Sequence, residues 1–138
     1  MPNEDRGKIK YPDRYKQLIS YEGLERRRHI TPTDFDGFID YNGVAFIYIE
    51  GKLEEKKFDY GQRRALENVI NSHILAKHEA CAIIFRHNEP PDKIIIAKDK
   101  FVSEIYYNNK WTQLKNNVTL LECIEKFENL CELKGLNI

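Results

Sequence analysis

A carboxylate and an ammonium group end the most apolar segment of the sequence. Residues 44–52, VAFIYIEGK, read as a β-strand, so Glu50 and Lys52 project from the same face at the end of a strand that borders the core. Carboxylates gathered beside one lysine suit phosphodiester hydrolysis with Mg²⁺ or Mn²⁺, because these metals prefer oxygen ligands. The metal would lower the pKa of a bound water, and Lys52 would orient the resulting hydroxide.

The segment before this strand, residues 33–41, carries three more acids. Asp34, Asp36 and Asp40 lie at even spacings, two and four positions apart, and so share one face, although Asp is depleted in strands. Acids in such a place need either a metal or cationic partners. Pairing with nearby arginines is the alternative to a metal site, and the spacing alone favours neither.

The turn between the two segments decides which acid meets Glu50. Its Asn-Gly pair is a strong hairpin signal, and a two-residue turn would put Asp36 and Glu50 on opposite faces. A three-residue turn over 41–43, closed by the glycine as a bulge, instead places Asp34 opposite Glu50 and Asp36 one diagonal away. We predict the bulged turn, which also buries Phe38.

Two helices are expected around this hairpin. A helical period begins at Asp13 and brings four residues to one face: Tyr15, Leu18, Ile19 and Glu22. The last member of that stripe is a carboxylate. A second helix is predicted over 61–77 from its apolar stripe, and Gln62 falls on the same inward face.

The rest of the chain predicts strands and a terminal helix. Strands are expected in four segments: 80–85, 94–97, 101–108 and 111–114. Thr119 and Glu122 form a capping box at the start of the final helix. The order of elements indicates one α/β domain over 13–138, after a loose polar leader at 1–12.

Composition and charge are consistent with one folded domain. The 138 residues are 41% hydrophobic and 12% aromatic, which is enough to bury one core. Three cysteines without a C-x-x-C pair are expected to be reduced core residues. We predict a cytoplasmic protein, since no segment is typical of a signal peptide or a membrane span. The 22 basic and 22 acidic side chains cancel, yet a nucleic-acid partner stays open because binding depends on where charge lies.

These motifs resemble the PD-(D/E)XK nuclease superfamily, which includes restriction endonucleases and archaeal Holliday junction resolvases. The resemblance lies in Asp36, in Glu50-Gly51-Lys52 and in the order of elements from 13 to about 87. The ten-residue step from Lys52 to Gln62, at the head of a helix, is similar to the VRR-Nuc group. The implied fold is a restriction endonuclease-like αβββαβ core, a mixed sheet flanked by helices, with extra C-terminal strands and a helix.

The resemblance implies a role for each matching residue. Asp36 and Glu50 would bind Mg²⁺ or Mn²⁺, and Gly51 would lend its carbonyl oxygen to the metal. Lys52 would activate or position a water, and Gln62 would support the lysine or contact a backbone phosphate.

Two of these assignments stay open. Some family members add a glutamate from the first helix, and Glu22 is in place for it, unless it is a carboxylate turned to water. The first metal ligand is Asp36 by the family pattern and Asp34 by the hairpin register. The sequence also departs from the family, because Pro32 lies two residues ahead of Asp34 and Gly51 stands where an apolar residue is usual.

Five arginines are the candidates for binding DNA: Arg26, Arg27, Arg28, Arg63 and Arg64. Together they suffice for a phosphate-binding lip, although arginines at a helix end are also favoured by the helix dipole. We therefore predict a metal-dependent DNA endonuclease, structure-specific in the manner of resolvases. The alternative is a catalytically inactive nuclease-fold module that binds DNA or a protein. Resolvases of this fold act as dimers, which makes a homodimer an option, and small free-standing members are often carried by phages and mobile elements.

Overall fold

The structure is a computed structural model that describes residues 7–138. The chain divides after Pro32 into two compact units, Met1–Pro32 and Thr33–Ile138, and each is described by itself. Of the leader predicted over 1–12, residues 1–6 lie outside the described part.

In the first unit, the described residues form two short helical turns, α1 (Pro12–Tyr15) and the 3-10 turn η1 (Arg27–His29). The helix predicted from Asp13 to Glu22 is therefore wrong beyond its first turn. Leu18 is 98% exposed and Ile19 is 74% exposed, so among the described residues the apolar stripe is not buried. A helix of about ten residues is marginal in water without such packing.

The second unit is built on a mixed sheet with the strand order β1-β2-β3-β4-β5. β2 and β3 are parallel, and the other neighbours are antiparallel. The described strands are β1 (Gly37–Tyr41), β2 (Ala45–Leu53), β3 (Glu79–His87), β4 (Phe101–Tyr107) and β5 (Lys110–Gln113). The strand predicted at 94–97 is wrong, because these residues lie in a largely exposed connection that ends in η2 (Ala97–Asp99).

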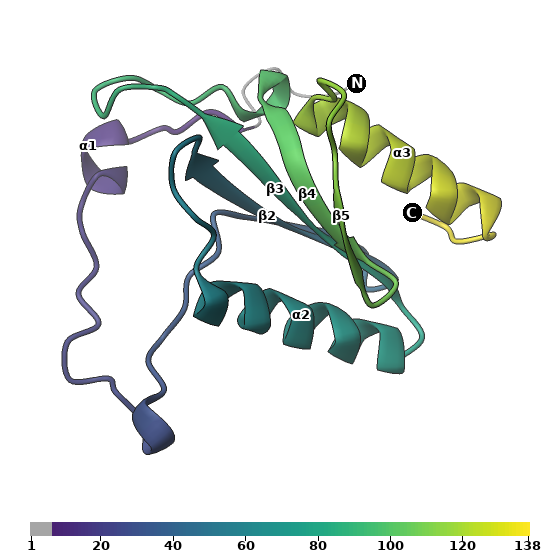
Figure 1. Cartoon of the computed structure of the whole chain (residues 1–138), viewed down its shortest axis with the longest axis horizontal. Coiled ribbons are helices and arrows are strands. Elements are labelled where there is room, and N and C mark those ends of the chain that lie inside the picture. Colours follow the sequence, from purple (N-terminus) through teal and green to yellow (C-terminus); the bar gives the residue numbers. More distant parts are fainter. Residues whose placement is uncertain (1–6) are drawn as a thin grey trace. The chain divides into compact units, whose positions relative to one another are not determined.

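One long helix covers each face of this sheet (Figure 1). α2 (Tyr60–Leu75) crosses over between the parallel strands β2 and β3, and α3 (Leu120–Leu133) follows β5. Leu66 and Ile70 of α2 pack on one sheet face, and Cys123 and Phe127 of α3 pack on the other. The predicted α/β class is confirmed as a mixed sheet flanked by helices.

Both helices begin where a polar side chain caps the first turn. Asp59 accepts a hydrogen bond from Gly61 N at 3.2 Å at the start of α2. At the start of α3 the predicted capping box is confirmed: Glu122 N donates to Thr119 Oγ1 at 3.2 Å, and Thr119 N donates to Glu122 Oε1 at 3.3 Å. The Asp59 cap places Gln62 in the first turn of α2.

The β1–β2 hairpin has the predicted extra residue, but at a different place. Asn42 and Gly43 both have positive φ, 55° and 79°, and Tyr41 pairs with Ala45, so Val44 is the residue left out of the ladder. The register with Asp34 opposite Glu50 is therefore wrong by two positions. Tyr41 is held in β1 because its hydroxyl donates to Glu128 Oε2 of α3 at 2.8 Å.

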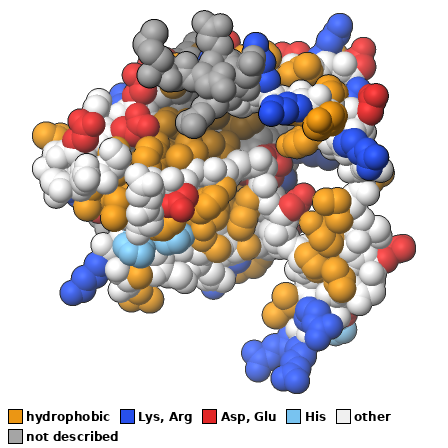
Figure 2. Space-filling view, turned by 180° about the vertical axis from the view of Figure 1, so that it is seen from behind, with side chains coloured by type: hydrophobic (Ala, Val, Ile, Leu, Met, Phe, Trp, Pro, Cys, Tyr) orange, Lys and Arg blue, Asp and Glu red, His pale blue; other side chains and the backbone are white. Residues whose placement is uncertain are grey.

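This register also changes the burial of Phe38. It pairs with Tyr48 rather than Phe46, and it is 53% exposed instead of buried. Its ring is stacked nearly parallel to the Phe46 ring, at a centroid distance of 6.0 Å. Figure 2 shows one face of the protein, on which exposed hydrophobic side chains (orange) lie beside histidines (pale blue).

Two further expectations concern cysteines and membranes. Cys81, Cys123 and Cys131 are free and buried, as predicted. Within residues 7–138, no helix combines the length and apolar character that crossing a bilayer requires.

Candidate functional site

Glu50 and Lys52 lie on the face of β2 that α2 covers. Phe46 and Tyr48 precede them at alternate positions and belong to the cluster around Leu66, so the same alternation brings Glu50 and Lys52 to this face. Glu50 is only 4% exposed, whereas Lys52 is half-buried. A carboxylate is thus drawn under the first turns of α2, with the lysine nearer to solvent.

Asp36 joins this pair from the residue before β1. One more step along the ladder from Gly37 and Ile49 brings Asp36 level with Glu50. Asp36 N donates to Glu50 Oε2 at 3.4 Å, and Gly51 N donates to Asp36 Oδ2 at 2.8 Å. The backbone of each strand end therefore holds the carboxylate that comes from the other.

The surroundings of Glu50 favour its protonated form. Burial, followed by the charge of Asp36, raises the pKa of Glu50 to about 7. A hydrogen bond with Gln62 and the charge of Lys52 lower the pKa, but they compensate only in part. At neutral pH Glu50 is therefore near the midpoint of its titration, and its protein neighbours do not fully offset the cost of ionising it.

Gln62 and Lys52 complete the group of side chains. Gln62 is half-buried in the first turns of α2 and hydrogen-bonds Glu50, which confirms the predicted inward orientation. Lys52 Nζ lies 3.8 Å from Glu50 Oε1 and 5.7 Å from the centroid of the Phe58 ring. The ammonium is held between a carboxylate and an aromatic face, which restricts where its protons point.

Gly51 is required by the packing behind the site. A Cβ added at this position would meet Cζ of Phe85 at 2.5 Å, closer than any real contact. Phe85 is a buried residue of the core under α3. Glycine at position 51 thus has a local cause, since the Phe85 ring takes the space that a side chain would need.

Three other predicted residues of the second unit lie outside this group. Asp34 is exposed and lies two residues before Asp36. Arg64 is exposed and pairs with Glu67 of its own helix at 3.0 Å. Arg63 bonds to Glu104 Oε2 at 2.7 Å. Four predicted residues lie in the first unit and are exposed there: Glu22, Arg26, Arg27 and Arg28.

The donors at the site fit a hard divalent cation. Asp36 and Glu50 offer carboxylate oxygens, and their uncompensated charge favours a cation between them. Among residues 7–138 there is no cluster of three or more His, Cys, Asp or Glu side chains placed to hold a metal. Two carboxylates suit Mg²⁺ or Mn²⁺, which are held by few protein ligands and keep several waters, better than a metal that needs a full protein cage.

Glu104 and Arg86 are buried or half-buried charged residues that the sequence reasoning missed. Glu104 lies level with Glu50 on the same sheet face, with Ile84 of β3 between them. The signal was present, because both charges interrupt or end apolar strands, as Glu50 does. Without a neighbouring motif, however, the sequence alone does not mark either residue as functional.

The family relationship rests on these residues alone. No family model, characterised protein or solved structure gives a significant match to the chain. Membership of the PD-(D/E)XK nucleases therefore stays a prediction from the residues at the site.

Proposed function

We propose that the protein is a metal-dependent DNA endonuclease that hydrolyses phosphodiester bonds. One observation carries the proposal: Asp36, Glu50, Lys52 and Gln62, chosen from the sequence, come together at one end of the sheet with Glu50 buried and under-neutralised. A structural ion pair would be expected to neutralise such a carboxylate, as Arg63 does for Glu104. A cation-dependent site has a reason to leave it uncompensated.

The metal would be Mg²⁺ or Mn²⁺, held by Asp36, Glu50 and the carbonyl oxygen of Gly51. When bound, it supplies an acidified water and neutralises charge that develops on the phosphate. Gly51 N already fixes the Asp36 carboxylate at 2.8 Å, so this ligand is oriented before any cation arrives. Such preorganisation reduces the reordering that binding requires.

Lys52 and Gln62 would act on the water and the phosphate. The Lys52 ammonium has three donors, and its nitrogen lies 3.8 Å from Glu50 Oε1, in ion-pair rather than hydrogen-bond range, so donors are left for an attacking water or a phosphate oxygen. The Gln62 amide hydrogen-bonds Glu50 and so ties α2 to the strand end. Burial under α2 keeps bulk water from Glu50 and strengthens these interactions.

DNA is the proposed substrate, and Arg64 is the best-placed of the predicted arginines in the second unit. Its side chain is 55% exposed, and it follows Gln62 by two residues on the first turns of α2. Arg63 is less suited to phosphate binding because its guanidinium already bonds to Glu104. A resolvase-like preference for branched DNA is the finer form of the proposal.

The test is cleavage of supercoiled plasmid, linear duplex and branched DNA with Mg²⁺ or Mn²⁺. Lys52→Ala and Glu50→Ala are expected to abolish cleavage, whereas Lys115→Ala, which removes an exposed lysine, is the matched control and should cut like the wild type. Cleavage that survives both site substitutions would overturn the mechanism. DNA binding by the wild type without cleavage of any substrate would favour the inactive module instead.

A further inference from the structure

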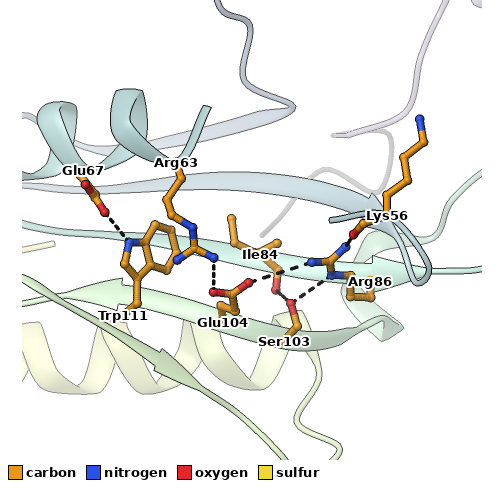
Figure 3. Close-up of polar contacts among 8 residues, drawn as sticks. All are labelled: Lys56, Arg63, Glu67, Ile84, Arg86, Ser103, Glu104 and Trp111. Atoms are coloured by element: carbon orange, nitrogen blue, oxygen red, sulfur yellow. Dashed lines mark hydrogen bonds and ion pairs between the residues drawn. The ribbon is translucent and has the colours of Figure 1, made fainter. Parts of the chain in front are cut away.

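A second charged cluster lies beside the proposed site on the same sheet face (Figure 3). Glu104 of β4 is 6% exposed, and its carboxylate lies between two guanidinium groups. Arg63 Nη2 is 2.7 Å from Glu104 Oε2, and Arg86 Nη2 is 4.0 Å from Glu104 Oε1. Unlike Glu50, this buried carboxylate is fully matched by cations.

Arg63 is held by its ion pair with Glu104 and by two aromatic rings. Its guanidinium carbon lies 4.4 Å from the centroid of the Trp111 ring and 5.2 Å from that of Phe58. Trp111 is itself fixed, since its Nε1 donates to Glu67 Oε2 at 2.7 Å. An arginine that is stacked and ion-paired in this way has little freedom, and lysine cannot reproduce the arrangement.

Arg86 connects the same carboxylate to the turn after the lysine of the site. It lies level with Lys52 in the parallel ladder, and its Nη1 donates to Leu53 O at 3.0 Å and to Lys56 O. Its Nε also donates to Ser103 Oγ at 3.4 Å. Arg86 thus holds the backbone that leaves β2 directly after Lys52.

Arg63 and Arg86 therefore connect one carboxylate, that of Glu104, to the segments that carry Gln62 and Lys52. Arg63 is the residue after Gln62, so fixing its side chain against β4 fixes the turn of α2 that carries Gln62. The Phe58 ring contacts Arg63 on one side and Lys52 Nζ on the other.

We propose that Glu104 is a positioning residue for the site: through Arg63 it sets Gln62, and through Arg86 it sets the strand end that carries Lys52. Its catalytic meaning rests on the proposed function, but the positioning itself does not. Glu104 touches none of the reacting groups in this proposal. It acts by holding α2 and the end of β2 at a fixed separation over Glu50.

Glu104→Gln is the informative variant, because it keeps the shape of the side chain and removes its charge. Its control is Glu79→Gln, which breaks the ion pair between Glu79 Oε1 and Lys134 Nζ, 2.7 Å long, at the other end of β3. Glu79 pairs with Ala45, about 16 Å along the strand from Glu50. Arg63→Lys is a second variant in case Glu104→Gln folds poorly.

The first readout needs no activity. In ¹H–¹⁵N spectra of the full chain, the Gln62 side-chain amide is identified by its loss in Gln62→Ala. Glu104→Gln and Arg63→Lys should move this signal by more than its line width, and Glu79→Gln should not. An unmoved signal in both site-side variants would overturn the proposal, as would an equal movement in the control.

The second readout is the cleavage rate. Glu104→Gln should lower kcat about tenfold to a hundredfold, the effect of a small misplacement of reacting groups, with KM changed less than about twofold. An unchanged kcat, or a fall confined to KM, would contradict positioning. If the wild type cuts no DNA while the Gln62 signal still responds to Glu104→Gln, the nuclease proposal fails and the positioning stands.

Discussion

Glu50→Gln is expected to make the metal-free protein more stable at neutral and alkaline pH. Most glutamate substitutions at buried sites destabilise, because they strand a partner. Here the ionised carboxylate is itself the unfavourable group, since burial and Asp36 raise the pKa of Glu50 to about 7 from an ordinary value of 4.5. Gln keeps the shape and an acceptor oxygen for the Asp36 N–H but carries no charge.

The size and the pH range of the effect follow from the two pKa values. The folded state binds the Glu50 proton more tightly than the unfolded chain, so the stabilising contribution of this group is fully present below about pH 4.5. It is lost as the pH rises from 4.5 to about 7. That interval, at about 1.4 kcal/mol per pH unit, corresponds to about 3 kcal/mol. The attraction to Lys52 is already included in this pKa, and solvent screening at the partly exposed neighbours reduces the gain, so we expect about 1–3 kcal/mol.

Urea denaturation in EDTA measures the effect directly. The free energy of unfolding of Glu50→Gln should match that of the wild type near about pH 4 and exceed it by about 1–3 kcal/mol at about pH 8. Comparing the two proteins at each pH cancels titration of the histidines. Glu132→Gln, which changes an exposed carboxylate of α3, should show no such pH-dependent difference.

Divalent cations should reverse the order of stability. Mg²⁺ at about a hundred times its Kd would stabilise the wild type by about 2.7 kcal/mol, and it should do less for Glu50→Gln because a ligand charge is gone. A variant that is destabilised equally at both pH values would refute the reasoning about Glu50. It would show that neighbouring groups stabilise the ionised Glu50 carboxylate, so that its pKa is not raised on folding.

Further substitutions test the packing and the helix capping of the second unit. Gly51→Ala should lower the free energy of unfolding by about 1–3 kcal/mol, because the added Cβ meets the Phe85 ring. Adding Phe85→Leu to the same protein should restore part of that free energy. If the two losses simply add, the proposed contact between position 51 and Phe85 is refuted. Phe38→Ala should cost less than about 1 kcal/mol and Phe46→Ala about 3–5 kcal/mol, and equal losses in urea melts would contradict the observed register. Thr119→Ala should cost about 1 kcal/mol by removing the cap of α3, which a thermal melt would detect; an unchanged melting temperature would mean that the capping box contributes nothing.

The local patterns of the second unit could be predicted because each is decided by neighbours in the sequence. Thr119 and Glu122 cap one another within a single turn, and the apolar period of α2 is visible without any partner. The same period in the first unit misled, since Leu18 and Ile19 need a surface to pack on and find none in their unit. Periodicity states which residues would share a face, and it does not supply the opposing layer.

The sequence by itself determined that Glu50 and Lys52 share a strand face, and that Gln62 turns inward from the next helix, because alternation and helical period are properties of one segment. Only the tertiary structure decided that Asp36, rather than Asp34, meets Glu50. In the folded chain Tyr41 pairs with Ala45, a register that brings Asp36 level with Glu50, and the Tyr41 hydroxyl donates to Glu128 of the distant helix α3.

The same holds for Glu104 and its two arginines. Each comes from a different element, α2, β3 or β4, and no spacing in the sequence relates them. Their meeting depends on the order of the strands and on the register between β3 and β4, which shifts at Ile84 and Phe85. Long-range pairing of this kind is set by the packing of the whole sheet, and only the folded chain reveals it.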